Sequence, residues 1–276
     1  MINAYTKEAL FNLNDDEFYE RLGIGKILFT ALHDRLEQFR EEQHSQGGRP
    51  NHLSVFSNLV IFLLYLRQYM TQTIIADIME VKKWDISRAY HWVLDTLIKQ
   101  GCLRLIGNRK AGAGTYLLID VTEIFINRPK RNQKRYYSGK KKHHTVKVQI
   151  IFDITKCKII SFYIADGRTH DFKMFKDSDP HFNELLKGLA DSGYQGISKI
   201  WSAIETPVKK QRGGQLTDDE KEFNHILSSI RIGIEHVNAW LKRFRILKDQ
   251  YRGRLRDLWK AVLFICAVFN IECPNV

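Results

Sequence analysis

Cysteine is scarce in this chain. The four cysteines stand at positions 102, 157, 266 and 273 and form no CxxC pair. This spacing argues against a zinc ribbon and against a dithiol redox motif. We expect all four cysteines to be reduced and structural.

Long apolar runs are also missing. The longest, residues 60–66 and 261–269, fall well short of the roughly 20 residues that a membrane-spanning helix needs. No secretory signal pattern follows Met1. These absences predict a cytoplasmic protein with no membrane partner.

Acidic side chains are outnumbered, because 31 Asp and Glu face 43 Lys and Arg and leave a formal net charge of +12. An excess of this size favours a polyanionic partner, most often nucleic acid. An anionic membrane surface is the alternative, but it requires a basic amphipathic helix or a lipidation signal, and the sequence contains neither. With 276 residues, the chain is long enough for one large or two small domains.

The first part of the chain has helical periodicity. Residues 1–47 predict a helical segment for packing or dimerisation, and residues 46–51, QGGRPN, then break the pattern. Residues 53–69, 72–80 and 85–100 predict three further helices. Ala76, Val81, Ile86 and Ala89 have the small and apolar spacing of a helix-turn-helix. We therefore expect residues 48–110 to form a DNA-binding domain, with a plain three-helix packing unit as the alternative.

The third of these helices is the expected recognition helix. Its predicted outward side chains are Ser87, Arg88, Tyr90 and His91, and the nearby lysines predicted to contact phosphates are Lys82 and Lys83.

Residues 111–276 have α/β character. The run TYLLIDV at 115–121 predicts a central strand buried on both faces, with Asp120 near its carboxyl end. A β-hairpin is predicted from residues 145–152 and 158–164. A later short strand ends at Asp191, before a glycine-rich stretch. A carboxylate at such an open strand end can approach a metal ion and a phosphate closely.

Residues 128–147 form the densest basic stretch, with tyrosines and histidines interleaved. A solvated loop is one interpretation. Basic and aromatic residues together are more typical of a surface that follows a phosphate backbone. The candidate DNA contacts in this stretch are Lys140, Lys141, Lys142 and His143.

Residues 216–247 predict a long helix with its N-cap at Thr217. Arg231, Glu235 and Lys242 follow at spacings of four and seven residues, so all three share one helix face. One interpretation is a surface ion-pair ladder. The other is a metal-binding carboxylate beside two cations that contact DNA phosphates.

Two strand-borne aspartates and one helix-borne glutamate make a candidate set of three carboxylates: Asp120, Asp191 and Glu235. Such a set can hold two divalent ions for an in-line phosphoryl displacement. Hard oxygen ligands favour Mg²⁺, or Mn²⁺ in its place, over zinc.

Several segments in this order resemble the DDE transposases with an RNase H-like catalytic core, specifically bacterial insertion-sequence transposases of family five and their Harbinger-type relatives. The similar segments are IDVTE (119–123), YYSGKKKHHTVKVQ (136–149), GRTHDFKMF (167–175), LADSGYQG (189–196) and the helix that contains Arg231, Glu235 and Lys242. The family's signature Tyr-x2-Arg-x3-Glu-x6-Lys maps onto that helix, with Ser228 in place of the tyrosine.

The resemblance implies an RNase H-like mixed sheet flanked by helices, preceded by an all-α region with a helix-turn-helix. It implies Asp120, Asp191 and Glu235 as a catalytic, Mg²⁺-binding triad. The implied function is to bind the terminal inverted repeats of an insertion sequence, cleave the element's ends and join them to target DNA near the nucleoid. A homodimer or larger oligomer is implied because two ends must be brought together. The alternatives are an inactive or domesticated relative that only binds DNA, and a host nuclease of the same fold.

Overall fold

The computed structural model describes residues 4–45, 47, 52–107, 115–178, 186–210 and 213–273. The chain divides into two compact units. The first unit comprises Met1–Arg104, Lys242–Asp249 and Arg254–Val268, and the second comprises Leu105–Leu241, Gln250–Gly253 and Phe269–Val276.

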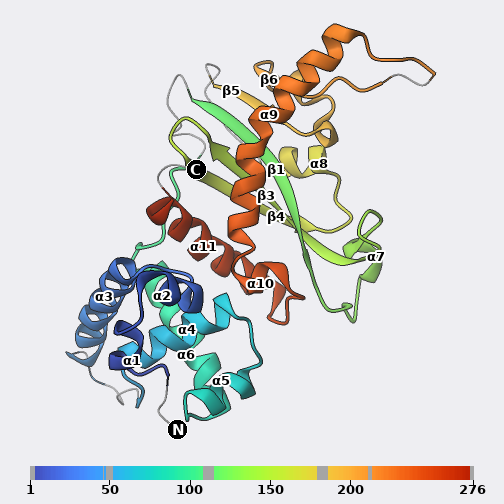
Figure 1. Ribbon diagram of the computed structural model, residues 1–276. Helices are drawn as coiled ribbons and strands as arrows, with labels where there is room; N and C mark the ends of the chain where they lie inside the picture. Colours follow the sequence, from blue (N-terminus) through green and yellow to red (C-terminus); the bar gives the residue numbers. More distant parts are fainter. Residues whose placement is uncertain are drawn as a thin grey trace. The chain divides into compact units, whose positions relative to one another are not determined.

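Helices dominate the first unit and a mixed sheet dominates the second (Figure 1). The helices are α1 (Lys7–Phe11), α2 (Asp15–Leu22), α3 (Lys26–Ser45), α4 (Val55–Arg67), α5 (Gln72–Ile78), α6 (Lys83–Lys99), α7 (Gln133–Tyr136), α8 (Asp171–Asp177), α9 (Asp218–Leu241), α10 (Arg245–Lys248) and α11 (Leu258–Glu272), with short 3₁₀ turns η2 (Ser192–Tyr194), η3 (Ile197–Lys199) and η4 (Leu255–Asp257). The strands are β1 (Tyr116–Phe125), β2 (Tyr137–Ser138), β3 (His143–Asp153), β4 (Lys158–Asp166), β5 (Lys187–Ala190) and β6 (Ile204–Glu205).

The three predicted helices of the helix-turn-helix are present as α4, α5 and α6. Thr71 caps α5, because its side chain accepts a hydrogen bond from the Ile74 amide at 3.3 Å. Ala76, Ile86 and Ala89 are buried together with Ile61 and Ile75. The small side chains lie where α5 and α6 pack, as the sequence spacing predicts.

Tyr90 corrects the predicted outward face of α6. Its side chain is 7% exposed, and its ring lies 5.8 Å from that of Phe62 and 5.2 Å from that of Tyr65, measured between centroids. Tyr90 follows Ile86 by four residues, so helical periodicity puts both on the buried face. It is therefore a core residue of the first unit.

The last helices of the chain belong largely to the same compact unit as the first helices. In the first unit, Phe264 of α11 contacts Phe62 edge to face at 4.8 Å between centroids, and Lys260 pairs with Asp95 of α6 at 2.6 Å. The second unit holds the end of α11, where Phe269 contacts Trp240 and Phe152. The compact units are thus built from segments that are far apart in the sequence.

Among the described residues, the sheet of the second unit has six strands. β3 lies between β4 and β1 and pairs antiparallel with both, whereas β1, β5 and β6 are parallel neighbours in that order. β2 adds a short antiparallel pairing to the start of β3. This is the mixed, helix-flanked sheet that the sequence predicts, and the hairpin of β3 and β4 is confirmed.

β1 is longer than predicted. The apolar run suggested an end at residue 121, but the strand continues to Phe125 because Thr122 and Glu123 pair with Val148 and Lys147 of β3. Asp120 therefore lies in the middle of β1 and not near its carboxyl end.

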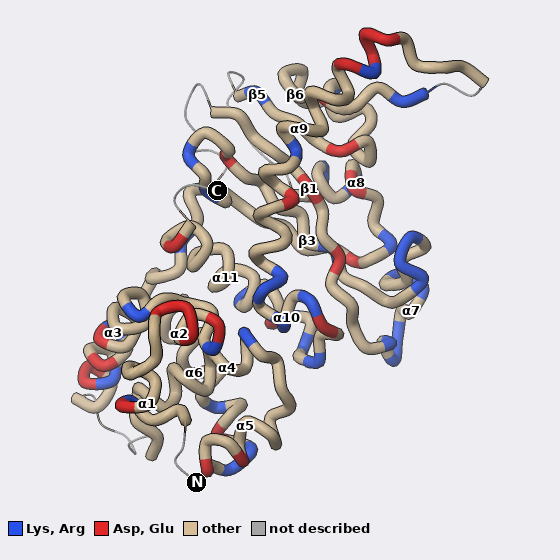
Figure 2. The backbone as a smooth tube through the Cα atoms, viewed as in Figure 1, with Lys and Arg blue, Asp and Glu red and all other residues tan. Residues whose placement is uncertain are grey.

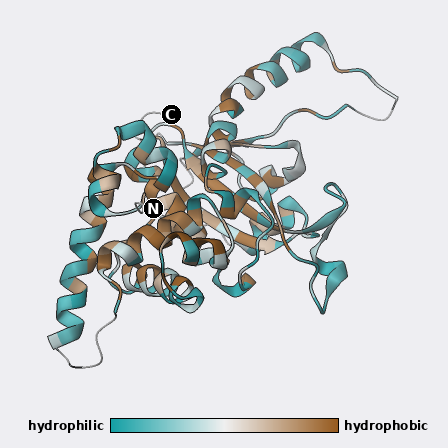
Figure 3. Cartoon of the chain, turned by 60° about the horizontal axis from the view of Figure 1, so that its bottom comes forward, coloured by the Kyte–Doolittle hydropathy of each residue, from teal (hydrophilic) through white to brown (hydrophobic). Residues whose placement is uncertain are grey.

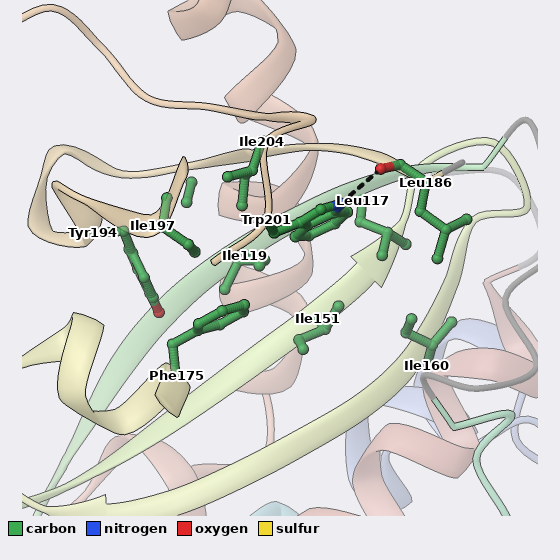
Figure 4. Packing of buried hydrophobic residues seen from close by; sticks show 11 residues of the cluster. Leu117, Ile119, Ile151, Ile160, Phe175, Leu186, Tyr194, Ile197, Trp201 and Ile204 are labelled. Carbon is green, nitrogen blue, oxygen red and sulfur yellow. Dashed lines mark hydrogen bonds between the residues drawn. The ribbon is translucent and has the colours of Figure 1, made fainter. Parts of the chain in front are cut away.

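The two faces of β1 have different coverings. Leu117 and Ile119 belong to an apolar cluster with Phe175, Tyr194 and neighbouring side chains from α8 and the 3₁₀ turns (Figure 4). Leu118 and Asp120 alternate with them and point to the opposite face. Helix α9 covers that opposite face (Figure 1).

Helix α9 begins as predicted, with Thr217 and Glu220 forming reciprocal hydrogen bonds at 3.2 and 2.8 Å. Its first half is mostly exposed and hydrophilic (Figure 3), whereas Ile234, Val237 and Leu241 in its second half are buried. Gly233 lies at the contact between α9 and β1, where an added Cβ would be at ordinary van der Waals distances of 3.5 Å from Leu118 and 3.4 Å from Ile154. The second half of α9 is therefore held against β1.

Candidate active site

Two of the three predicted carboxylates lie on neighbouring strands. Asp120 is in the middle of β1, and Asp191 directly follows β5, which pairs with β1 in parallel. Asp191 also accepts a hydrogen bond from the Ser192 amide at 2.5 Å, which orients its side chain. Side-chain exposures are 19% for Asp120 and 35% for Asp191. The sheet thus presents both carboxylates at the surface that α9 covers in part.

Arg231 of α9 links these two aspartates. Its Nη1 donates a hydrogen bond to Oδ1 of Asp191 at 3.1 Å, and its Nη2 lies 4.0 Å from Oδ1 of Asp120. The predicted ion-pair ladder does not form, because no ion pair joins Arg231 to Glu235 among the residues that the structure describes. The guanidinium instead faces the strand-borne acids.

Asn238 is a site residue that the sequence reasoning missed. Its Nδ2 donates a hydrogen bond to Oδ2 of Asp120 at 2.8 Å. Its buried Oδ1 has no hydrogen-bond partner among the described residues. The available signal was its spacing of three residues from Glu235, which places it on the same helix face.

Glu235 stands between Arg231 and Asn238 on that face, four residues after one and three before the other. Because both neighbours contact the aspartates, the Glu235 backbone is held beside them. Its side chain is exposed, and no hydrogen bond or ion pair to it occurs in the described part of the chain. The structure therefore joins Asp120 and Asp191 through Arg231 but does not bring Glu235 into direct contact with them.

The charge of Asp120 is disfavoured in this setting. Burial raises the pKa of its carboxyl to about 6, and Asp191 and Asp171 add to the rise, while the Val121 amide and Arg231 oppose it. The charges of Asp171 and Asp191 therefore act on the same carboxyl that Arg231 faces.

A second ion pair borders the site. Nζ of Lys147 lies 2.8 Å from Oδ1 of Asp171, at the start of α8, and donates to the Thr169 carbonyl at 2.7 Å. The buried Tyr194 hydroxyl donates to Oε1 of Gln149 at 3.2 Å. Burial and the nearby acids Asp171, Asp120 and Asp191 raise the pKa of Tyr194, so it remains protonated. This tyrosine is structural.

The donor set fits a hard divalent cation. Asp120 and Asp191 offer carboxylate oxygens on either side of a guanidinium, so the site already stabilises positive charge between them. Magnesium and manganese prefer such oxygen ligands. Within the described ranges, no three His, Cys, Asp or Glu side chains are gathered closely enough to hold a metal ion.

Comparison with known proteins decides the family. Residues 119–270, more than half of the chain, match the family described as DDE superfamily endonuclease. The chain belongs to the DDE superfamily of endonucleases. Residues 51–103 match the helix-turn-helix of DDE superfamily endonucleases.

Two curated relatives agree with this assignment of a DDE endonuclease. A protein of Microchaete diplosiphon, named as a probable transposase for insertion sequence element IS702, is 34% identical over 96% of this chain and 97% of its own length. A protein of Streptomyces albus G, named as a transposase for insertion sequence element IS112, is 25% identical over 73% of this chain and 74% of its own length. The resemblance to DDE transposases is thereby confirmed, as are the fold class and the helix-turn-helix.

The candidate DNA contacts of this DDE endonuclease in its helix-turn-helix lie around the start of α6. Lys82, Lys83, Arg88 and His91 are exposed, and Ser87 is half-buried. Nζ of Lys82 lies 5.0 Å from the Trp84 ring, and Arg88 lies 3.9 Å from the buried Asp85. These basic side chains are accessible to DNA.

The candidate contacts in the catalytic unit lie between β2 and β3. Lys140, Lys141 and Lys142 are exposed in the turn, and His143 is exposed at the start of β3, with its ring 5.3 Å from that of Phe125. Figure 2 shows Lys and Arg gathered around this part of the unit, near α7. The basic stretch of residues 128–147, for which a solvated loop was one interpretation, contains α7, β2, a turn and the start of β3.

Lys242 lies outside α9, unlike Arg231 and Glu235. Helix α9 ends at Leu241, so Lys242 follows the helix and is half-buried, in the first compact unit.

No helix of the described residues is long and apolar enough to cross a membrane.

Proposed function

We propose that this DDE endonuclease is the transposase of a bacterial insertion sequence. The helix-turn-helix binds the terminal inverted repeats, and the second unit cleaves the element's ends and joins them to target DNA. The observation that carries the proposal is the pairing of Asp120 and Asp191 with Arg231, on the helix face that also holds Glu235. The names of the two curated relatives support it.

Asp120, Asp191 and Glu235 would hold Mg²⁺, with Mn²⁺ as a substitute. When bound, the ions lower the pKa of an attacking water or hydroxyl and stabilise charge on the leaving oxygen. The three side chains supply fixed ligands from two strands and one helix, so their spacing is set by the fold. Hydrolysis and strand transfer use the same site, because each is the attack of an oxygen on phosphorus.

The neighbouring residues position this set. Asn238 holds Oδ2 of Asp120 by a hydrogen bond, which leaves Oδ1 facing Arg231. Arg231 is a forked donor suited to the non-bridging oxygens of a phosphate. Because two ends are processed together, we propose a homodimer or larger oligomer on double-stranded DNA.

The test is a cleavage and strand-transfer assay with Mg²⁺, using the DNA end that flanks the gene. Asp120→Asn and Asp191→Asn are compared with wild type, and end binding is measured for each. We expect both variants to bind and neither to cut, since each lacks one carboxylate ligand. If wild type binds without cutting in Mg²⁺ or Mn²⁺, the chain is a binding-only relative. If the wild type cuts the DNA end but does not join it to target DNA, the chain is a nuclease of the same fold.

A further inference from the structure

A basic hollow of about 1150 Å³ lies in the second compact unit. Its walls come from residues 130–135 around α7, residues 163–166 at the end of β4, and residues 168–177 from the following turn and α8. We call it the α7 groove. Its charged lining consists of Lys130, Lys134, Arg135, Arg168, Lys173, Asp166 and Asp177, beside His170.

Both acids of the α7 groove are already paired. Asp166 pairs with Arg135. Nζ of Lys173 donates to both carboxylate oxygens of Asp177, at 2.9 and 2.8 Å. Lys130, Lys134 and Arg168 are exposed, and no carboxylate of the described residues forms an ion pair with any of them. The groove therefore presents three uncompensated positive charges to a ligand.

The wall is a packed structure and not a loose loop. The Arg168 amide donates to the Arg135 carbonyl at 3.2 Å, and the Gly167 amide donates to the Thr145 carbonyl at 3.0 Å. A Cβ at Gly167 would lie only 2.5 Å from that carbonyl oxygen and 2.6 Å from that of Tyr136. The turn after β4 thus packs directly on the segment that ends α7, which fixes the spacing of Arg168 and Lys134.

The α7 groove adjoins a smaller hollow that reaches Asp171. This smaller hollow, of about 200 Å³, shares Arg168, Thr169 and His170 with the groove and is also lined by Val121, Lys147 and Asp171. Asp171 lies beside the turn that follows Asp191, because a Cβ added at Gly193 would be 2.8 Å from its Oδ2. The charge of Asp171 also acts on Asp120. A polyanion that fills the groove therefore leads toward the proposed catalytic carboxylates.

We propose that the α7 groove binds the phosphodiester backbone of the DNA segment that continues from the scissile phosphate. This inference rests on the proposed function for its choice of partner. Lys130, Lys134 and Arg168 each contact one phosphate, and the paired Arg135 and Lys173 shape the walls. Nucleic acid is favoured over an acidic peptide because the groove opens beside a site for phosphoryl transfer.

The experiment measures DNA affinity against salt for the full-length protein, in EDTA, so that binding is read without cleavage. The DNA is a duplex carrying the element's end and its flank. The groove variant combines Lys130→Ala, Lys134→Ala and Arg168→Ala. The matched control combines Lys7→Ala, Lys187→Ala and Lys199→Ala, which removes the same charge from exposed positions outside the groove.

We expect the groove variant to reduce the slope of log K against log salt by about 2.7, or about 0.9 for each lost phosphate contact. The control variant should change the slope by less than one. Arg168→Lys should retain the wild-type slope, because it retains the charge. Equal slopes for groove and control variants would overturn the proposal. The proposal would also be overturned if the groove variant bound DNA as the wild type does but no longer bound polyglutamate. The ligand of the groove would then be an acidic peptide. Neither result depends on whether the wild type cuts DNA.

Discussion

At the scale of single residues, the charge on Asp120 opposes folding of the metal-free protein. Burial and neighbouring acids raise the pKa of Asp120 from an ordinary value of 3.8 to about 6. A raised carboxyl pKa means that the folded chain binds the proton more tightly than the unfolded chain. The stability that this proton contributes is fully present below about pH 4 and is lost as the pH rises through about 6.

Asp120→Asn should therefore stabilise the metal-free protein at pH 7.5. The expected gain in the free energy of unfolding is on the order of 2–3 kcal/mol, since one pKa unit corresponds to about 1.4 kcal/mol. The gain should shrink toward zero as the pH falls to 4. Denaturant unfolding in EDTA measures it, with the exposed Glu222→Gln as control. A gain that does not depend on pH would contradict the role assigned to the Asp120 charge.

Asn238→Ala should shift the acid limb of the pH profile of DNA cleavage to higher pH. The substitution removes a donor to the Asp120 carboxylate, and loss of a hydrogen bond to the charged form raises a carboxyl pKa. The matched control is Asn224→Ala on the same helix, whose amide bonds the Val208 backbone instead. It should cost about 1 kcal/mol of stability and leave the pH profile in place. The same profile shift in both variants would assign Asn238 a merely structural role.

The sequence was sufficient to propose Asp120, Asp191 and Glu235, because each lies in a motif of fixed order. Asn238 could not be found in this way, since its contact with Asp120 depends on how far α9 is shifted along β1. Tyr90 is different. Its spacing of four residues from Ile86 puts it on the buried face, so the outward prediction was wrong.

At the scale of elements, the contact between α9 and β1 sets the geometry of the site. Gly233 lies at this contact. A Cβ atom added to it would be 3.4–3.5 Å from two side chains, which is an ordinary van der Waals distance. A methyl group therefore fits at this position.

Gly233→Ala should be neutral or stabilise the protein by about 0.5–1 kcal/mol, because alanine is the better helix former. Gly233→Leu should destabilise by about 1–3 kcal/mol through overpacking and should lower the cleavage rate by moving Glu235 and Arg231 from the aspartates. Thermal unfolding and a cleavage assay on the two variants measure both effects. Equal stability and activity for the leucine variant would show that α9 is not fixed by this contact.

The sequence predicted the bounds of a strand less well where they depend on pairing with a neighbouring strand. The strand around Asp120 was identified from its apolar run, but its continuation to Phe125 includes polar residues that pair with β3 and have no apolar signal. The hairpin of β3 and β4 had alternation and a turn, so its pairing was predictable. The sequence of residues 170–187 also predicts a helix or two, interrupted near Pro180. Helix α8 lies at the start of this range, and residues 179–185 lie outside the described ranges.

At the scale of the whole molecule, the helix-turn-helix and the three candidate carboxylates belong to different compact units. The helix-turn-helix lies in one unit, and Asp120, Asp191 and Glu235 lie in the other. The division could not be read from chain order. Periodicity shows that α11 buries a face, but it does not show that most of this helix packs with the N-terminal helices.

We predict that Arg88→Ala weakens binding to the repeat end by about 1–3 kcal/mol if Arg88 reads a base, because it is exposed on the recognition helix. The cleavage rate at saturating protein should remain within about twofold of wild type. Competition with scrambled DNA separates base reading from phosphate contact. An equal loss of affinity for repeat and scrambled DNA would show that Arg88 contacts only the backbone.

The most direct test of the central claim concerns Glu235, the third carboxylate. The measurement is the rate of Mg²⁺-dependent cleavage of a bound element end by wild type, Glu235→Gln and Glu222→Gln, two matched substitutions of exposed glutamates on α9. We predict that Glu235→Gln binds the end normally and loses at least a thousandfold in rate, or about 4 kcal/mol of transition-state stabilisation. Glu222→Gln should cleave like wild type. If Glu235→Gln retains its rate, the carboxylate site does not include this helix face and the account is wrong.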